Sequence, residues 1–110
     1  MTAAEIIEKV DGVKPNAYTD EDKLGWLNEL EYAIQTDVYD LAEGFTAHDS
    51  AEEDLLLGPE WGRLYTSWLE ARIAAANGEF DEYANLMQIH NGFSGEFERW
   101  YARHHVDPDD

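Results

Sequence analysis

The sequence predicts an all-α fold: a small helical bundle that ends in a long antiparallel helical hairpin. Two observations predict it. Apolar residues recur at spacings of three and four along most of the chain, and capping residues, glycine and proline fall between these runs. At 110 residues the chain has room for one domain, residues 1–110, whose core is large enough to fold alone by a modest margin.

The first helix is expected at about residues 3–11. Thr2 can cap its free amides, and Glu5 follows three residues later, as in a capping box. One apolar edge then precedes Gly12; it consists of Ile6, Ile7 and Val10. The linker 13–16, with sequence Val-Lys-Pro-Asn, separates this helix from the next.

The second helix is expected at about residues 20–42. Thr19 can cap it, and an acidic first turn complements the positive end of the helix dipole. Gly44 marks its end. One apolar stripe runs along this helix at helical spacing: Leu27, Leu30, Ile34, Val38 and Leu41.

Residues 45–58 are expected to form an acidic loop on the surface. Its apolar run Leu55–Leu57 ends at Gly58-Pro59. We expect at most one short extended segment there, laid against the helices, and the alternative is a single helical turn.

The C-terminal half is predicted to be the helical hairpin, with helices at about residues 59–77 and 80–104. Pro59 suits a first helical turn, and Asn77-Gly78 is a good helix stop. The connecting turn is too short for anything but an antiparallel pair. In the second helix, large apolar residues keep helical spacing across Gly92 and Gly95, so we expect one long helix, followed by a frayed tail at 106–110.

The net charge of −18 excludes several classes of partner. The stretch from Leu24 to Gly62 contains ten carboxylates and no Lys or Arg, so binding to nucleic acid or to an anionic membrane is not expected. The chain has no cysteine, and no apolar run approaches the roughly 20 residues that span a bilayer. We expect synthesis in the bacterial cytoplasm, with the acidic groups outside an apolar core.

Candidate chemistry is sparse, so the chain is not expected to be an enzyme. A di-metal helical bundle needs Glu-x-x-His on two helices, and this motif is absent. His90 lies on an apolar stripe, where packing in the core is favoured over a role as ligand or base. His104-His105 could chelate a metal in a mobile tail, although a solvated tail is favoured. We therefore predict no catalytic, cofactor-binding or metal-binding residues. A metal or small-ligand bundle enzyme is the third hypothesis, and the absence of the two motifs counts against it.

Aromatic residues are the strongest signal in the chain. There are four Trp, six Tyr and four Phe, many for a domain of this size. Most belong to the predicted core, but Trp and Tyr that stay at the surface suit a protein interface. The candidate interface residues are Trp61, Tyr101 and Phe45.

Two groups of residues resemble a known family of small phage proteins. The first half contributes the run from Val10 to Asn16, then Lys23 and the run from Trp26 to Glu29. The second half contributes Leu64-Tyr65, the run from Trp68 to Ala71, Ile73, Asn77-Gly78-Glu79, Tyr83, Asn85, Phe93, Phe97, Trp100-Tyr101 and Arg103. Together they resemble the head-tail connector, or head-completion adaptor, family of tailed phages and prophages. The likeness covers most of the chain and carries no catalytic motif.

The resemblance implies a structural adaptor in the virion that joins the portal to the tail. Its expected partners are the portal protein and a tail-side adaptor, with other copies of the chain forming a ring in the connector region. Because each subunit carries −18, we expect the ring to be weak in isolation, with the isolated chain a monomer. The alternative function is a small acidic inhibitor that mimics DNA and occupies a host DNA-binding protein.

Overall fold

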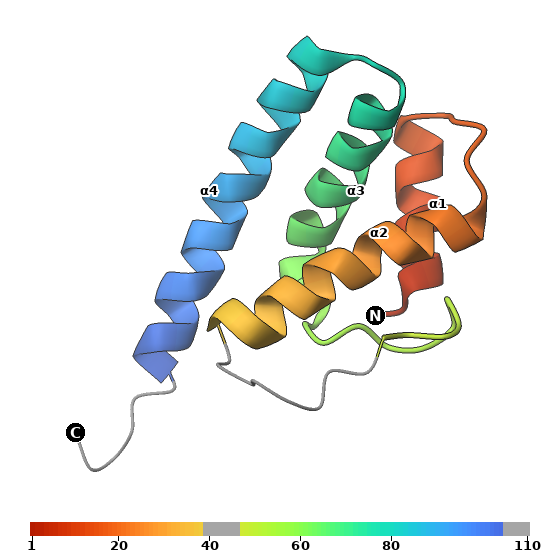
Figure 1. The fold of residues 1–110 in the computed structure, drawn as a ribbon. Helices are drawn as coiled ribbons and strands as arrows, with labels where there is room; N and C mark the ends of the chain where they lie inside the picture. The colour runs from red at the N-terminus through yellow and green to blue at the C-terminus, as the bar shows by residue number, and fades with distance from the viewer. Residues whose placement is uncertain (39–46, 105–110) are drawn as a thin grey trace.

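The protein folds as an all-α domain, as the sequence predicts. The computed structural model describes residues 1–38 and 47–104. Helices α1, α3 and α4 stand side by side, and α2 crosses one face of this layer (Figure 1). The elements in order are α1 (Ala3–Val13), α2 (Asp20–Ala33), the π-helix η1 (Ile34–Val38), the 3-10 helix η2 (Pro59–Trp61), α3 (Gly62–Ala76) and α4 (Phe80–His104).

Both N-terminal helices begin at the predicted caps. The Thr2 hydroxyl accepts the Glu5 N–H at 3.2 Å, and the Thr19 hydroxyl accepts the Asp22 N–H at 3.0 Å. Each side chain satisfies an amide that has no partner within its helix. Helix α1 continues to Val13, two residues beyond its predicted end.

Helix α2 is α-helical only as far as Ala33, which is shorter than the predicted 20–42. The wider π-helix continues the chain from Ile34 to Val38, and residues 39–42 lie outside the described residues. At this transition the Thr36 hydroxyl donates to the Tyr32 carbonyl, four residues back, at 2.9 Å. Such bonds compete with the backbone ladder and often distort a helix.

The loop 47–58 forms no helical turn at Leu55–Leu57. Asp54 forms an isolated antiparallel bridge with Thr2, and the Leu55 N–H donates to the Met1 carbonyl at 2.8 Å. Leu55 and Leu57 are buried, whereas Leu56 is exposed. The expected short extended segment is therefore confirmed, and this loop pairs with the chain just before α1.

The C-terminal hairpin forms as predicted (Figure 1). Helix α3 stops at Asn77-Gly78, where Gly78 adopts a φ of +77°, a left-handed conformation that glycine accepts without strain. One continuous helix, α4, then runs for 25 residues back along α3. The sequence predicts that one helix continues across Gly92 and Gly95, and both residues lie inside α4.

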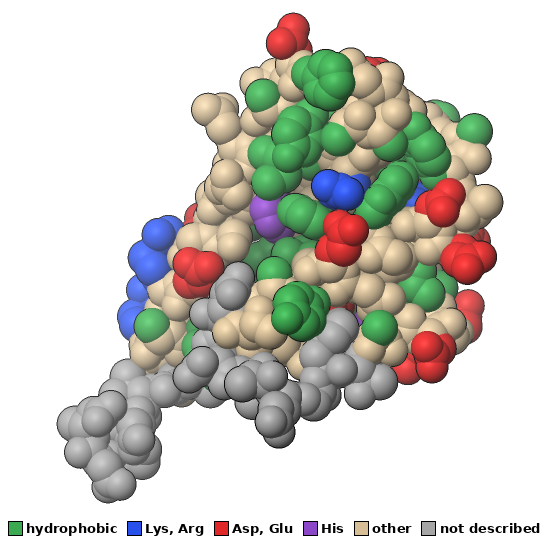
Figure 2. Space-filling model, viewed as in Figure 1, with side chains coloured by type: hydrophobic (Ala, Val, Ile, Leu, Met, Phe, Trp, Pro, Cys, Tyr) green, Lys and Arg blue, Asp and Glu red, His purple; other side chains and the backbone are tan. Residues whose placement is uncertain are grey.

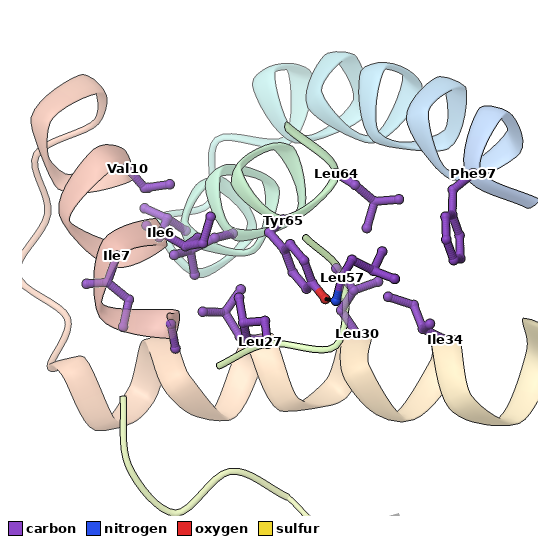
Figure 3. Packing of buried hydrophobic residues seen from close by; sticks show 14 residues of the cluster. Ile6, Ile7, Val10, Leu27, Leu30, Ile34, Leu57, Leu64, Tyr65 and Phe97 are labelled. Atoms are coloured by element: carbon purple, nitrogen blue, oxygen red, sulfur yellow. Dashed lines mark hydrogen bonds between the residues drawn. The ribbon is translucent and has the colours of Figure 1, made fainter. Parts of the chain in front are cut away.

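A single apolar cluster joins all four α-helices and the 47–58 loop. In Figure 3, Ile6 and Val10 of α1 point toward the centre, and Phe97 projects from α4 toward Ile34. Among residues 1–38 and 47–104, no helix is both long and apolar enough to cross a lipid bilayer. The buried members of the cluster are Ala3, Ile6, Ile7, Val10, Leu27, Leu30, Ile34, Leu55, Leu57, Leu64, Tyr65, Leu69, Ile73 and Phe97.

Candidate functional site

An aromatic cluster lies where the end of α4 meets η2. Phe97 is its buried centre, with only 1% of its surface exposed. The Trp61 ring stands edge-on to Phe97 at 5.2 Å and to Trp100 at 5.7 Å between centroids. Tyr101 lies 6.1 Å from Phe97. Such geometries favour the ring quadrupoles as well as burying apolar area.

The structure brings two of the three predicted interface residues together. Trp61 and Tyr101 both pack on Phe97 and are both partly buried, so each belongs to the edge of the core and also reaches the surface. The third predicted residue, Phe45, lies outside the described residues. The aromatic end of the hairpin is thus a surface with a rigid core beneath it.

A fully buried carboxylate, Glu31 of α2, is the polar centre of the fold. Its Oε1 accepts the Tyr65 hydroxyl at 2.5 Å, and its Oε2 accepts the Leu56 N–H at 2.9 Å. The His48 Nε2 lies 2.9 Å from the same Oε2. Tyr65 in turn accepts the Leu57 N–H at 3.1 Å (Figure 3). Glu31 and Tyr65 therefore hold the 47–58 loop against α2 and α3.

Glu31 was not predicted as a buried group, although the sequence carries a signal for it. Glu31 falls four residues after Leu27 and three before Ile34, so it lies on the apolar stripe of its helix. A carboxylate there must find donors or remain exposed. Both of its oxygens lie within hydrogen-bond distance of groups of the chain itself, an arrangement that serves the fold.

A second buried charge, Lys23 of α2, pairs with α1. Its Nζ lies 2.8 Å and 3.1 Å from the two carboxylate oxygens of Asp11. Burial pushes the pKa of Asp11 upward, but hydrogen bonds from Lys23 and Asn16 outweigh it and hold the pKa below the usual value. Lys23 is only 3% exposed, so this pair fixes the angle between the first two helices.

The histidines of α4 occupy structural positions. The His90 ring is buried, with Nδ1 3.0 Å from the Leu64 carbonyl oxygen and the ring 5.3 Å from that of Trp68. This is the core role that the sequence favours. His104 is exposed, stacks on Trp100 at 4.8 Å and places its Nδ1 2.7 Å from the Trp100 carbonyl. Its neighbour His105 lies outside the described residues.

Acid is expected to destabilise the fold through His90. Burial lowers the pKa of this imidazole, while its hydrogen bond to the Leu64 carbonyl pulls the pKa upward. Because the folded pKa is depressed, the stability from neutral His90 is fully present above the unfolded value of about 6.5. It is lost as pH falls through the folded pKa. Urea titrations between pH 7.5 and 5 should show this decline.

The matched comparison uses two variants of α4. His90→Gln should show a shallower decline than the unaltered chain, whereas His104→Gln, at an exposed position, should reproduce the original slope. Equal slopes for the unaltered chain and His90→Gln would refute the assignment.

The acidic residues of the 47–58 loop mostly serve local structure. Glu53 Oε2 accepts the N–H groups of Asp49 and Ser50 at 2.7 and 2.9 Å, and Asp54 pairs with the N-terminal amine at 3.3 Å. Within the described part of the chain, no three His, Asp or Glu side chains converge as metal ligands would. These residues therefore act as turn and terminus caps.

Two hollows on the surface differ in character. A groove of about 460 Å³ runs between α1 and α3 and contains both Lys9 and Arg63. A smaller hollow of about 250 Å³ lies between α1, the start of α2 and the 47–58 loop. The smaller one is acidic; it is lined by Ala4, Ile7, Glu8, Asp11, Asp20, Ala51 and Glu52.

Comparison of the chain with models of protein families, with curated proteins and with solved structures finds no match.

Proposed function

We propose that this protein is a structural adaptor of tailed-phage virions, a ring-forming connector between the portal and the tail. The proposal rests on the resemblance of both halves of the chain to the head-tail connector family. It assigns no catalytic residue and no cofactor, and it places the working protein in the connector region of a virion.

The observation that carries the proposal is a set of contacts between the resembling N-terminal run and the hairpin turn. Lys14, from the linker of the resembling N-terminal run, forms ion pairs with Glu79 and Glu82 at 2.9 and 3.0 Å. Tyr18 donates to Asn77 at 2.8 Å, so the linker is clamped onto the hairpin turn.

The same motif also orders the linker internally. The Asn16 amide donates to the carboxylate of Asp11 and to the Lys14 carbonyl, and its oxygen accepts the Tyr18 N–H at 3.1 Å. The two separate stretches of resemblance thus form one connected framework rather than a scatter of similar residues.

The aromatic end of the hairpin is the surface that we propose for contact with the portal or the tail adaptor. Trp61 and Tyr101 lie there on a rigid support, which lowers the entropy lost when a partner binds. Partly exposed Trp and Tyr are the residues most enriched in the centres of protein interfaces.

The inhibitor alternative gains no specific support. DNA mimicry needs carboxylates at regular spacing on one exposed face, but several here are committed within the chain. Glu31 is buried, Asp11 neutralises Lys23, and Glu79 and Glu82 share Lys14.

The test is co-expression with a portal protein of a tailed phage, the partner that the proposal names. We expect the two to purify together and to appear as stacked rings by electron microscopy. The chain alone at low salt should scatter light as a monomer, because each copy carries −18. A tight ring at low salt without the portal would contradict the expected assembly, and failure to bind the portal would remove the proposed function.

A further inference from the structure

Helix α4 lies at the edge of the molecule with its outer face uncovered. Only His90 and Phe97 of its 25 residues are buried, and they mark the side that packs on α3 (Figure 1). Helical spacing identifies the residues that lie on the opposite side of α4. The stripe on that side begins at Asp81 in the first turn. Its C-terminal part, which we call the outer face of α4, consists of Gln88, Gly92, Gly95, Arg99 and Arg103.

The two glycines of the outer face lower helix stability, and among the described residues only Arg99 lies against either of them. A side chain at Gly92 would meet nothing within 4 Å, and one at Gly95 would meet only Arg99 of the same helix. Each glycine in a helix interior costs about 1 kcal/mol relative to alanine. Gly92 leaves the backbone uncovered, whereas at Gly95 a guanidinium nitrogen of Arg99 lies 3.3 Å from where a Cβ would stand.

The charge of this face is opposite to that of the molecule. Only seven Lys and Arg oppose 25 Asp and Glu in the chain. Arg99 and Arg103 are exposed one turn apart on the outer face, and within residues 1–38 and 47–104 neither forms an ion pair. The carboxylates of this part of α4, Glu96 and Glu98, lie to either side of the stripe.

The opposite side of the molecule carries the complementary charge. Figure 2 shows Lys and Arg at the edge over the end of α4, where Asp or Glu also lies nearby, and a row of Asp and Glu along the far rim. There the acidic hollow brings Glu8, Asp20 and Glu52 together. Glu8 and Glu52 are exposed and form no ion pair among the described residues, while Asp20 lies 3.8 Å from Lys23.

We propose that the outer face of α4 docks on the acidic hollow of a second copy, with Arg99 and Arg103 entering beside Glu8 and Glu52. The guanidinium group suits this role because it pairs with carboxylates through two parallel hydrogen bonds. The inference deepens the proposed connector function. The contact itself does not depend on that function, whereas the number of copies that assemble does.

This contact is heterologous, because the two surfaces lie on different sides of one molecule. Each copy then offers a free outer face and a free hollow, so the contact repeats, giving a ring where the rotation between copies closes and an open helix where it does not. Repulsion between whole subunits acts at long range and is screened beyond about 8 Å at physiological salt, whereas ion pairs in direct contact are screened less. Association should therefore be strongest at moderate ionic strength.

The absence of cysteine allows a direct test. One preparation carries Ala102→Cys, next to Arg103, and a second carries Ala51→Cys, in the lining of the hollow. A short bis-maleimide should join the two in a mixture far more than it joins either one to itself. As a matched control, Ala102→Cys mixed with the exposed variant Glu60→Cys should give only background.

Charge exchange tests the chemistry of the contact. Arg99→Glu with Arg103→Glu in the first preparation should lower the mixed product about tenfold or more, since like charges then face each other. Glu8→Arg with Glu52→Arg in the second preparation should restore it. Circular dichroism of each variant verifies that the helices are intact.

The outcomes separate this interface from the proposed function. Cross-linking of Ala102→Cys to itself would indicate symmetric packing of α4 and overturn the inference, as would background levels in the mixture both with and without the portal. Portal binding in that second case would leave the connector function standing. A specific mixed product without portal binding would support this interface and remove the connector function.

Discussion

Replacing Glu31 with alanine is expected to lower the free energy of unfolding by about 3–5 kcal/mol. The carboxylate is fully buried and accepts hydrogen bonds from Tyr65 and from the Leu56 N–H. Its loss leaves these donors without their acceptor, at a cost of about 1–3 kcal/mol for each buried group. His48 loses the same partner, so the 47–58 loop should separate from α2.

Urea denaturation followed by circular dichroism measures this loss, and Glu29→Ala is the matched control. Glu29 lies on the same helix, half-exposed, with Arg72 at 3.5 Å. An exposed pair of this kind contributes about 0–1 kcal/mol. If Glu31→Ala cost no more than Glu29→Ala, the buried network would not be what holds the loop.

Replacing Phe97 with alanine is expected to cost about 3–5 kcal/mol, the range for truncating a buried Phe. The ring is 1% exposed and contacts the rings of Trp61, Trp100 and Tyr101. Its removal opens a cavity at the end of the hairpin and takes away the support of the proposed partner surface. Trp fluorescence and the urea midpoint should shift together.

Phe80→Ala provides the comparison within the same helix. Phe80 is 70% exposed at the start of α4, so its truncation should change the free energy of unfolding by no more than about 0.5 kcal/mol. Equal losses at both positions would contradict the placement of the core at the far end of the hairpin.

Most of the helical framework could be predicted from the sequence, because its determinants are local. Thr2 and Thr19 cap the helices that they precede, and Gly78 takes the left-handed conformation that ends α3. Apolar spacing of three and four places each buried stripe on one face whatever the partner is. The antiparallel hairpin then follows from the shortness of its turn.

The extent of the second helix was predicted less well. Apolar spacing continued beyond Ala33, but the chain changes to a π-helix at Ile34, where the Thr36 hydroxyl bonds to a backbone carbonyl. The π-helix has only five residues, about one turn, which is too short for its wider spacing to show in the apolar pattern.

The polar centre could not be predicted, since its members are far apart in the chain. Tyr65 reaches Glu31 across 34 residues, and Lys23 reaches Asp11 across 12. Whether a charged residue on an apolar stripe is buried depends on donors that only packing supplies. Local sequence thus determined where the helices begin and which faces are apolar, while the tertiary structure decided which charges lie inside, because their pairing requires distant segments to meet.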